Sequence, residues 1–237
     1  MSNPPSPALL ATLMDRLGSR GFTTEAADLA PWLTDWRQLY RGKAAAMLSP
    51  TGVEEVSDIV RLCAGEGVAL VPQGGNSSMA GGATPDATGE ALLLSMRRMN
   101  RLRSISADAN VAVAEAGLIL AHLHDAAAEV GRRFPLTLGA RGSATIGGLV
   151  STNAGGTQVL RFGPMRSLVL GLEAVLPDGS LFEGLTALKK DNRGYDLRQL
   201  LFGAEGTLGV ITAASLRLAA VTMPSVPSAP ISSCFRS

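Results

Sequence analysis

Basic stripes, aromatic residues and paired cysteines are all scarce in this chain of 237 residues. Its 21 basic and 20 acidic residues nearly cancel, and only 4% of its residues are aromatic, which argues against a nucleic-acid partner. Cys63 and Cys234 form neither a CxxC pair nor a disulfide framework, which favours a reducing compartment. No stretch approaches about 18 consecutive apolar residues, and the first residues lack a signal-peptide pattern. These absences predict a soluble, cytoplasmic protein without a membrane span.

Histidine is also scarce, because His122 and His124 are the only two in the chain. Two metal ligands on one helix need a spacing of three or four residues, whereas these two are two residues apart. We therefore interpret both as surface residues of a helix. The sequence predicts no metal site.

A few other unusual side chains are interpreted as structural. Glu205 stands between Gly203 and Gly206, where it either anchors a turn through backbone N–H groups or faces a ligand, and we favour the turn. The other interpretations are Cys63 as helix core, Trp32 and Trp36 as a packing patch, and Lys189, Lys190 and Asp191 as a solvated loop.

Hydrophobic periodicity predicts an α+β protein in which hairpins are more frequent than βαβ units. With 46% hydrophobic residues, the chain has ample apolar side chains for a packed core. Thr51 and Glu54 are spaced as a capping box. Helices are expected over residues 8–18, 51–67 and 118–131, strands over 44–50, 68–72, 91–96 and 208–218, and hairpins over 104–117 and 168–184.

Glycine is concentrated in two segments, residues 72–86 and 139–156. The first, PQGGNSSMAGGATPD, contains four glycines and no lysine, unlike the phosphate loops of nucleotide hydrolases. An anion bound there must be neutralised by backbone N–H groups, which glycine can present because it tolerates left-handed conformations. Either segment alone is equally well explained by tight turns, but two together favour one extended dinucleotide. The nicotinamide pattern GxGxxG is absent.

Four motifs follow one another along the chain: PQGGNSSMAGGATP, FPLTLGARGSATIGGLVSTNAGG, VLPDG and KKDNRGYDLRQLLFGAEGTLGVIT. In this order they resemble the FAD-binding domain of the FAD-linked oxidases related to vanillyl-alcohol oxidase. The most similar branch contains D-2-hydroxyglutarate dehydrogenase, D-lactate dehydrogenase and the FAD subunit of glycolate oxidase. The resemblance implies a flavoprotein oxidoreductase that acts on the CH–OH group of a D-2-hydroxy acid.

The resemblance also implies a domain organisation. A helical lead-in over residues 1–40 would precede an FAD-binding domain over 41–220, built from two α+β subdomains at about 41–96 and 97–218. Residues 221–237 are rich in serine and proline, and we expect this tail to be disordered.

Cofactor-binding residues follow from the same motifs. The resemblance assigns the FAD pyrophosphate to Gly74, Gly75, Asn76, Ser77, Gly81 and Gly82, framed by Pro72 and Pro85. It assigns the ribityl chain and isoalloxazine to Pro135, Leu138, Gly139, Thr145, Gly147, Gly148, Asn153, Gly155 and Gly156, and the adenine end to Val210 and Ile211. Some relatives tether the flavin through a histidine in the first segment, where this chain has Asn76 and Ser77. The FAD is therefore expected to be non-covalent.

Catalytic residues are not assigned within the chain. In the family, the catalytic histidine, the carboxylate-binding arginine and the substrate pocket belong to a C-terminal cap domain that would begin near Ala220. We expect this cap to be absent and the chain to be a shortened portion that is inactive alone. Two alternatives stay open: a subunit completed by a cap on another chain, and a flavin-free binding or structural module. The hydroxy acid, the electron acceptor and any homo-oligomer are left open.

Overall fold

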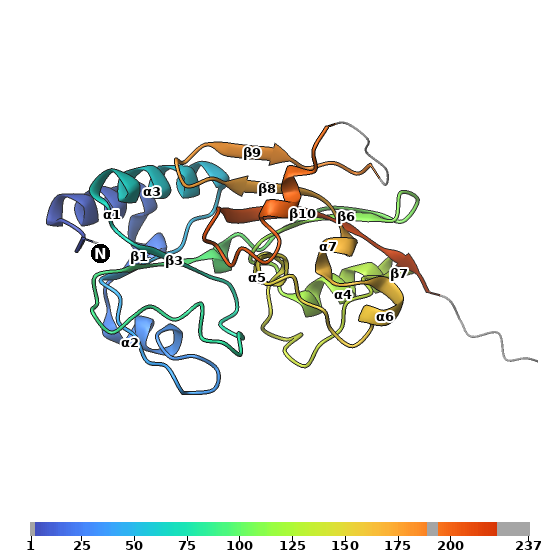
Figure 1. Ribbon diagram of the computed structural model, residues 1–237, viewed down its shortest axis with the longest axis horizontal. Coiled ribbons are helices and arrows are strands. Elements are labelled where there is room, and N and C mark those ends of the chain that lie inside the picture. The colour runs from blue at the N-terminus through green and yellow to red at the C-terminus, as the bar shows by residue number, and fades with distance from the viewer. Residues whose placement is uncertain (1–2, 189–193, 222–237) are drawn as a thin grey trace, which may run out of the picture.

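The computed structural model describes residues 3–188 and 194–221, and two main sheets lie side by side in it (Figure 1). Lys189, Lys190 and Asp191 lie outside these ranges, as do Cys234 and the Ser/Pro-rich tail beyond Val221. Within the described ranges, no helix combines the length and the apolar content needed to cross a bilayer.

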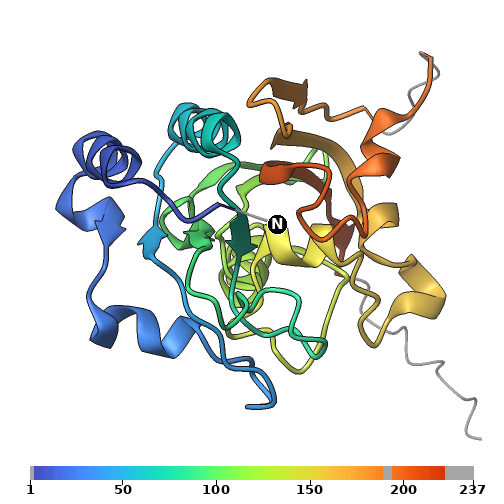
Figure 2. The same ribbon diagram turned by 60° about the vertical axis from the view of Figure 1, so that its left-hand side comes forward.

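The first sheet has four strands in the order β1-β2-β4-β3. They are β1 (Phe22–Thr23), β2 (Ala46–Leu48), β4 (Leu92–Ser95) and β3 (Leu70–Gln73). β2, β4 and β3 are parallel, and α3 (Val53–Glu66) is the crossover from β2 to β3. α3 buries Val56, Ile59 and Cys63, on the face that the sequence predicts. Figure 2 shows α1 (Pro7–Gly21) beside α3.

The second sheet is antiparallel, in the order β5-β6-β10-β8-β9. Its strands are β5 (Leu102–Ser106), β6 (Val111–Glu115), β10 (Val210–Arg217), β8 (Val169–Val175) and β9 (Leu181–Gly184). Helices lie on one side of this sheet in Figure 1: α4 (Leu120–Glu129), α5 (Ile146–Ser151), α6 (Val159–Phe162) and α7 (Met165–Leu168). The helices and the sheet enclose one apolar core, which includes Leu123, Ile146 and Leu172.

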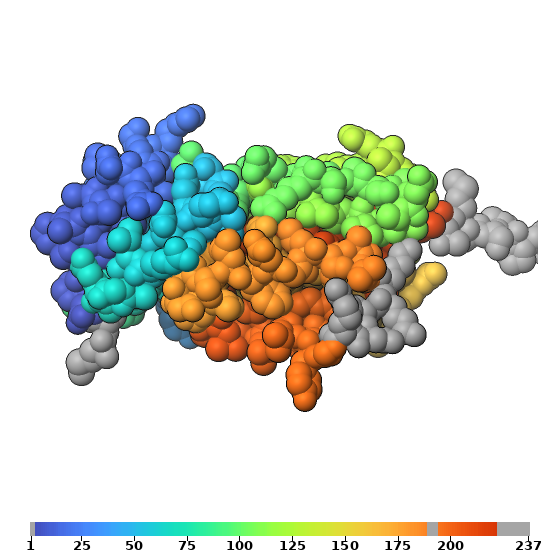
Figure 3. Space-filling model, turned by 90° about the horizontal axis from the view of Figure 1, so that it is seen from above, coloured from blue at the N-terminus to red at the C-terminus, as the bar shows by residue number. Residues whose placement is uncertain are grey.

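A second apolar core joins the two sheets. Ala116, Val175 and Val210 of the second sheet are buried in the same cluster as side chains of α1, α3, β2 and β4. The hydroxyl of Ser57 on α3 donates a buried hydrogen bond of 2.6 Å to the carbonyl oxygen of Gly179, in the β8–β9 turn. Figure 3 shows this hairpin packed against α3 on the surface seen from above. The relative position of the sheets is therefore fixed by apolar packing and by a specific polar contact.

Three local expectations need correction. The capping box at Thr51 and Glu54 is wrong, because the backbone N–H of Thr51 donates to the carboxylate of Glu55 at 2.7 Å. The first helix extends to Gly21, although Gly18 leaves the helical conformation with a φ of 64°. The lead-in is not purely helical, since it contributes β1 after α1 and before α2 (Ala26–Leu29) and the 3-10 helix η1 (Ala30–Trp32).

The sequence analysis also missed several short elements. β7 (Arg132–Arg133) pairs with β11 (Ala219–Ala220) in a separate two-stranded sheet. Two further 3-10 helices are η2 (Met96–Arg98) and η3 (Leu197–Leu200). Such short segments carry too little periodicity to be recognised from the sequence.

An ionic network centred on the buried Glu115 joins strands β5, β6 and β8 of the second sheet and Arg101, which directly precedes β5. The fully buried Glu115 accepts hydrogen bonds from the guanidinium groups of Arg101, at 2.8 Å, and Arg103, at 3.2 Å. Arg103 also forms a two-pronged ion pair with Glu173, at 2.9 and 3.0 Å. Burial raises the pKa of Glu115, but hydrogen bonds from Arg101 and Arg103 outweigh it and hold this pKa below its ordinary value.

Glu115→Gln should lower the free energy of unfolding at pH 7 by about 1–3 kcal/mol, because it removes the negative charge shared by two guanidinium groups. The folded-state pKa of Glu115 is lowered, so the wild-type advantage is complete above the unfolded value of about 4.3 and is lost as pH falls through the folded value. Urea unfolding at pH 7 and pH 3 measures both effects. Glu183→Gln, on the exposed edge strand β9, is the matched control. Equal destabilisation by the two variants at pH 7 would contradict the network's role.

Candidate functional site

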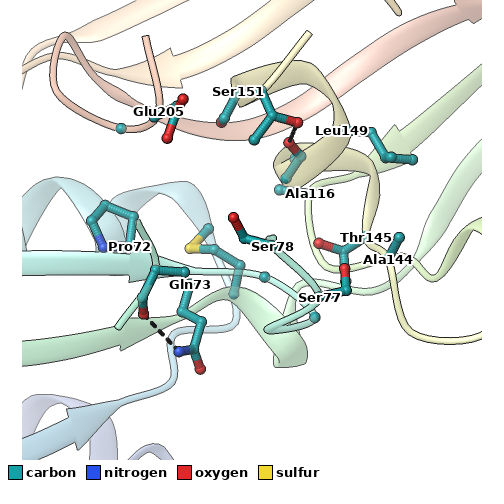
Figure 4. A pocket seen from close by; sticks show the side chains of 18 of the residues that line it. Pro72, Gln73, Ser77, Ser78, Ala116, Ala144, Thr145, Leu149, Ser151 and Glu205 are labelled. Carbon is teal, nitrogen blue, oxygen red and sulfur yellow. Dashed lines mark hydrogen bonds between the residues drawn. The ribbon is translucent and has the colours of Figure 1, made fainter. Parts of the chain in front are cut away.

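A cavity of about 300 Å³ lies between the two sheets, where the two glycine segments meet (Figure 4). Its wall comes from the loop after β3, from the end of β6, from α5 and its flanking loops, and from residues 205–211 at the start of β10. The cavity therefore collects segments that are far apart in the sequence. Because the cavity lies between the two sheets, its wall needs both glycine segments.

Backbone-to-backbone packing of the two glycine segments closes one side of the cavity. A Cβ atom on Gly74 would lie 2.2 Å from the hydroxyl oxygen of Thr145, and one on Gly75 would lie 1.7 Å from the carbonyl oxygen of Ser143. Gly75 has no room for a side chain because backbone stands in the way, whereas a side chain on Gly74 would have to displace the Thr145 hydroxyl. Glycine is required here because two backbones approach closely, in addition to any conformational need.

The charges around the cavity differ from those of a lysine-based phosphate loop. Its lining residues in the described part of the chain include no lysine, arginine or histidine, and Glu205 is the ionisable one among them. An anionic ligand must therefore be held by backbone N–H groups and hydroxyl groups. The hydroxyl oxygen of Thr145 is buried and has no hydrogen-bond partner within the described residues, and Figure 4 shows it beside Ser77 at the cavity wall. The glycine-rich lining without a cation among the described residues and this unpaired hydroxyl fit a dinucleotide held by backbone and hydroxyl groups.

Most of the sequence-predicted cofactor residues line the cavity. They are Pro72, Gly74, Gly75, Asn76, Ser77, Gly82, Leu138, Thr145, Gly147, Gly148, Val210 and Ile211. The others lie outside its lining: Gly81, Pro85, Pro135, Gly139, Asn153, Gly155 and Gly156.

Several of the residues outside the lining shape the loops instead. Gly81 has a φ of 73° and packs against the ring of Tyr40, which leaves no room for a side chain. Gly156 has a φ of 71° and lies against the carbonyl oxygen of Thr137. Asn153 accepts a hydrogen bond from the backbone N–H of Arg166 at 3.0 Å. These residues act on the cavity indirectly, through the course of the backbone.

Asn76 combines a strained backbone with a side chain that binds the lead-in. Its φ is 50°, and its side-chain amide donates a hydrogen bond of 2.8 Å to the carbonyl oxygen of Thr34. The neighbouring Gln73 donates to the carbonyl oxygens of Trp32, at 2.9 Å, and Ala83, at 2.8 Å. Two side-chain amides thus connect the first glycine segment to residues 32–34.

Sequence reasoning missed some lining residues, including Gln73, Met96, Ala116 and Ser151. They are ordinary side chains at strand or helix ends, without a composition signal. Glu205 combines the two alternatives that the sequence offered for it. Its backbone N–H anchors the turn by donating to the carbonyl oxygen of Ser151 at 3.1 Å. The residue also lines the cavity. Figure 4 shows its carboxylate facing the space above Pro72.

The structural interpretations of other side chains have mixed outcomes. Cys63 is 1% exposed, as predicted for helix core, and burial raises its pKa to about 12. His122 is exposed, whereas His124 is half-buried, with Nε2 3.0 Å from the carbonyl oxygen of Leu136. Trp32 packs against an apolar cluster as expected, but the packing interpretation is wrong for Trp36, which is 65% exposed.

Comparison with known proteins identifies the family to which the chain belongs. A sequence model of the FAD binding domain matches residues 44–184. The mitochondrial D-2-hydroxyglutarate dehydrogenase of Bos taurus is 47% identical over 193 residues, which are 81% of this chain and 35% of that protein. A putative mitochondrial D-lactate dehydrogenase of Schizosaccharomyces pombe is 41% identical over 194 residues, 82% of this chain and 36% of that protein. A solved alkyldihydroxyacetonephosphate synthase superposes with a TM-score of 0.81 at 21% identity, over 93% of this chain and 41% of that one.

The fold and the site thus define a flavin-nucleotide-binding protein of the vanillyl-alcohol oxidase type. The chain belongs to the FAD binding domain family, and its cofactor is FAD. The predicted α+β fold and the resemblance to the FAD-binding domain of the FAD-linked oxidases are confirmed. The chain spans about a third of the length of the curated relatives it matches. The prediction of a cytoplasmic protein is wrong, because these relatives are named as mitochondrial enzymes.

Gly75→Ala should weaken FAD binding by about 10-fold or more, because forcing a side chain into a packed contact costs about 1–3 kcal/mol. The added methyl group would meet the Ser143 backbone, which cannot move without separating the two segments. Gly142→Ala is the matched control, since a Cβ there meets nothing within 4 Å. FAD titration followed by flavin fluorescence measures both variants, with circular dichroism as the check on folding. Equal FAD affinity of the folded Gly75→Ala variant and wild type would show that this contact does not shape the site.

Proposed function

We propose that this chain binds FAD non-covalently in the cavity between its glycine segments and forms the flavin-binding part of a D-2-hydroxy-acid dehydrogenase. The observation that carries the proposal is the cavity where two glycine-rich segments meet, whose lining has no cation among the described residues. FAD, when bound, supplies the acceptor for the hydride that leaves C2 of the hydroxy acid. The chain's own residues hold and orient the cofactor and exclude water from it.

Within this proposal each glycine segment has a separate task. Backbone N–H groups of residues 74–77 and of Gly82 hold the pyrophosphate, with Gly81 shaping the loop, and residues between Pro135 and Gly156 follow the ribityl chain and the isoalloxazine. Val210 and Ile211 contact the adenine end. Residues 41–96 and 97–218 then act as two subdomains that each contribute one segment. The packing of Gly74 and Gly75 against residues 143–145 supports this division.

The non-covalent attachment is supported by the chemistry of the first segment. Asn76 and Ser77 have no nucleophilic imidazole, and the amide of Asn76 donates its hydrogen bond to Thr34 instead of facing the cavity. The buried thiol of Cys63 is protonated, because burial raises its pKa to about 12, and Cys63 does not line the cavity. No lining residue in the described part of the chain offers a ready covalent anchor.

The substrate class comes from the relatives by analogy. Their names point to D-2-hydroxyglutarate and D-lactate, and glycolate is a third candidate of the same chemistry. Oxidation of such acids needs a base for the hydroxyl proton and a cation for the carboxylate. The cavity lining within the described residues has no cation, and Glu205 is its one ionisable side chain. We propose that sequence outside residues 1–237 contributes these groups, either from a cap on the same polypeptide or from a separate cap subunit.

Acid precipitation should release all of the flavin into the supernatant, because no covalent bond retains it. The measurement is flavin absorbance in supernatant and pellet after precipitation of the purified, yellow protein. Denaturation in guanidinium chloride followed by gel filtration serves as a second separation with a different chemistry. Flavin that stays with the polypeptide in both would refute non-covalent binding.

The FAD-loaded chain should not oxidise D-lactate, D-2-hydroxyglutarate or glycolate at an enzymatic rate when it is tested alone. Missing proton transfer alone lowers the rate by about 10²- to 10⁴-fold, and missing substrate positioning lowers it further. The test is anaerobic mixing with each acid while the flavin absorbance is followed, with dithionite as the control for reducible flavin. Fast, enantioselective bleaching by this chain alone would place the catalytic groups within residues 1–237.

A further inference from the structure

A second cavity, of about 500 Å³, lies on the other face of the first glycine segment and is distinct from the flavin cavity. Its wall is formed by the loop that follows η1, at the lower left of Figure 1, together with Gly75, Asn76 and Ser143. η1 contributes Pro31 and Trp32, and the loop contributes Thr34, Asp35, Trp36, Gln38 and Arg41. Gly75 and Asn76 line both cavities, so the same stretch of backbone separates them.

The second cavity is rich in hydrogen-bond donors. Within the described residues, no side chain pairs with the guanidinium of Arg41 or with the indole N–H groups of Trp32 and Trp36. A further guanidinium, that of Arg97, stacks 5.5 Å from the ring centre of Trp32. Guanidinium and indole groups donate hydrogen bonds and accept none. This combination favours an anionic ligand.

The acidic residue of the cavity does not neutralise these donors. Asp35 is 3% exposed, and its carboxylate accepts hydrogen bonds from the backbone N–H groups of Tyr40, at 2.6 Å, and Arg37, at 3.1 Å. The hydrogen bond from Tyr40 in particular holds the pKa of Asp35 below its ordinary value, which keeps it ionised and tied to its own loop. Asp35 therefore shapes the loop and leaves Arg41 available.

We propose that this second cavity binds a small organic carboxylate through Arg41. A carboxylate is favoured over a phosphate because it is flat, pairs with a guanidinium in two parallel hydrogen bonds, and lies readily against indole rings. The site goes beyond the proposed function, since it is a second ligand site on the face of the glycine segment away from the flavin. Its ligands include the class of acid that the proposed reaction would consume or form.

Contacts already described connect the site to the flavin loop. The amide of Asn76 donates to the carbonyl oxygen of Thr34, and that of Gln73 donates to the carbonyl oxygen of Trp32. Both acceptors belong to the loop that carries Arg41. A carboxylate that orders this loop therefore orders backbone that also lines the flavin cavity.

The chain contains its own reporter for this site, because Trp32 and Trp36 are its only two tryptophans. D-lactate and D-2-hydroxyglutarate should change the tryptophan fluorescence of the full chain saturably, whereas neutral D-lactamide should not. Inorganic phosphate should bind more weakly than the carboxylates. Higher salt should weaken binding, since the site is open and salt screens exposed charges. Calorimetric titration of the same samples provides a readout independent of fluorescence.

Arg41→Gln should weaken carboxylate binding roughly 10- to 100-fold, as expected for loss of a charged hydrogen-bond donor, and Arg41→Lys should have an intermediate effect. Arg37→Gln is the matched control, because it removes the same charge from the same loop but from a residue that does not line the cavity. Unchanged binding by Arg41→Gln, equal binding of D-lactamide, or stronger binding of phosphate would each overturn the proposal. Flavin content, measured by absorbance in every sample, reports separately on the proposed function, since loss of FAD leaves the tryptophan signal readable.

Discussion

Direct contact between two glycine-rich backbones is the constraint on which the functional site depends. Gly75 lies so close to the backbone of Ser143 that a single methyl group would separate the two segments, and Gly74 packs against the hydroxyl of Thr145. This contact closes the cavity and fixes the loop that leaves β3 against the loop that enters α5. Glycines outside the lining, such as Gly81 and Gly156, then serve the same contact by letting each backbone take the course that reaches it.

Sheet topology brings the four lining segments to one place. β3 and β4 are parallel, so their carboxyl ends lie at the same edge, where ligand sites of parallel sheets are commonly found. β6 and β10 are antiparallel, so the end of one lies beside the start of the other and places Ala116 near Ile211. The shared apolar core and the Ser57 hydrogen bond hold these two arrangements together. The site is therefore a property of the junction and of neither sheet alone.

The sequence predicts the parts of this structure that depend on local pattern. Apolar spacing located α3 and α4, and alternation and turn residues located both hairpins. Most of the cofactor residues assigned from motif order line the cavity, although they make up less than half of its lining. It did not reveal that β2, β3 and β4 are parallel, because strand direction is set by long-range packing. It also missed Ala116 and Gln73, because their place in the lining comes from their position at strand ends and no local sequence pattern marks it. Trp36 was misjudged because an aromatic residue in a polar loop has no neighbours that sequence can identify.

The distribution of charge around the first glycine segment has a consequence for how each face recognises a ligand. On the flavin face, the lining has one carboxylate and no cation among the described residues, so an anion is held by backbone dipoles in direct contact. Their geometry is set by backbone packing, and small changes in that packing alter recognition more than salt does. On the other face, the proposed carboxylate site depends on the charge of Arg41, which reaches farther but is screened by ions. Because Gln73 and Asn76 connect the two faces by hydrogen bonds, a ligand held by charge on one face biases the backbone that the other face depends on.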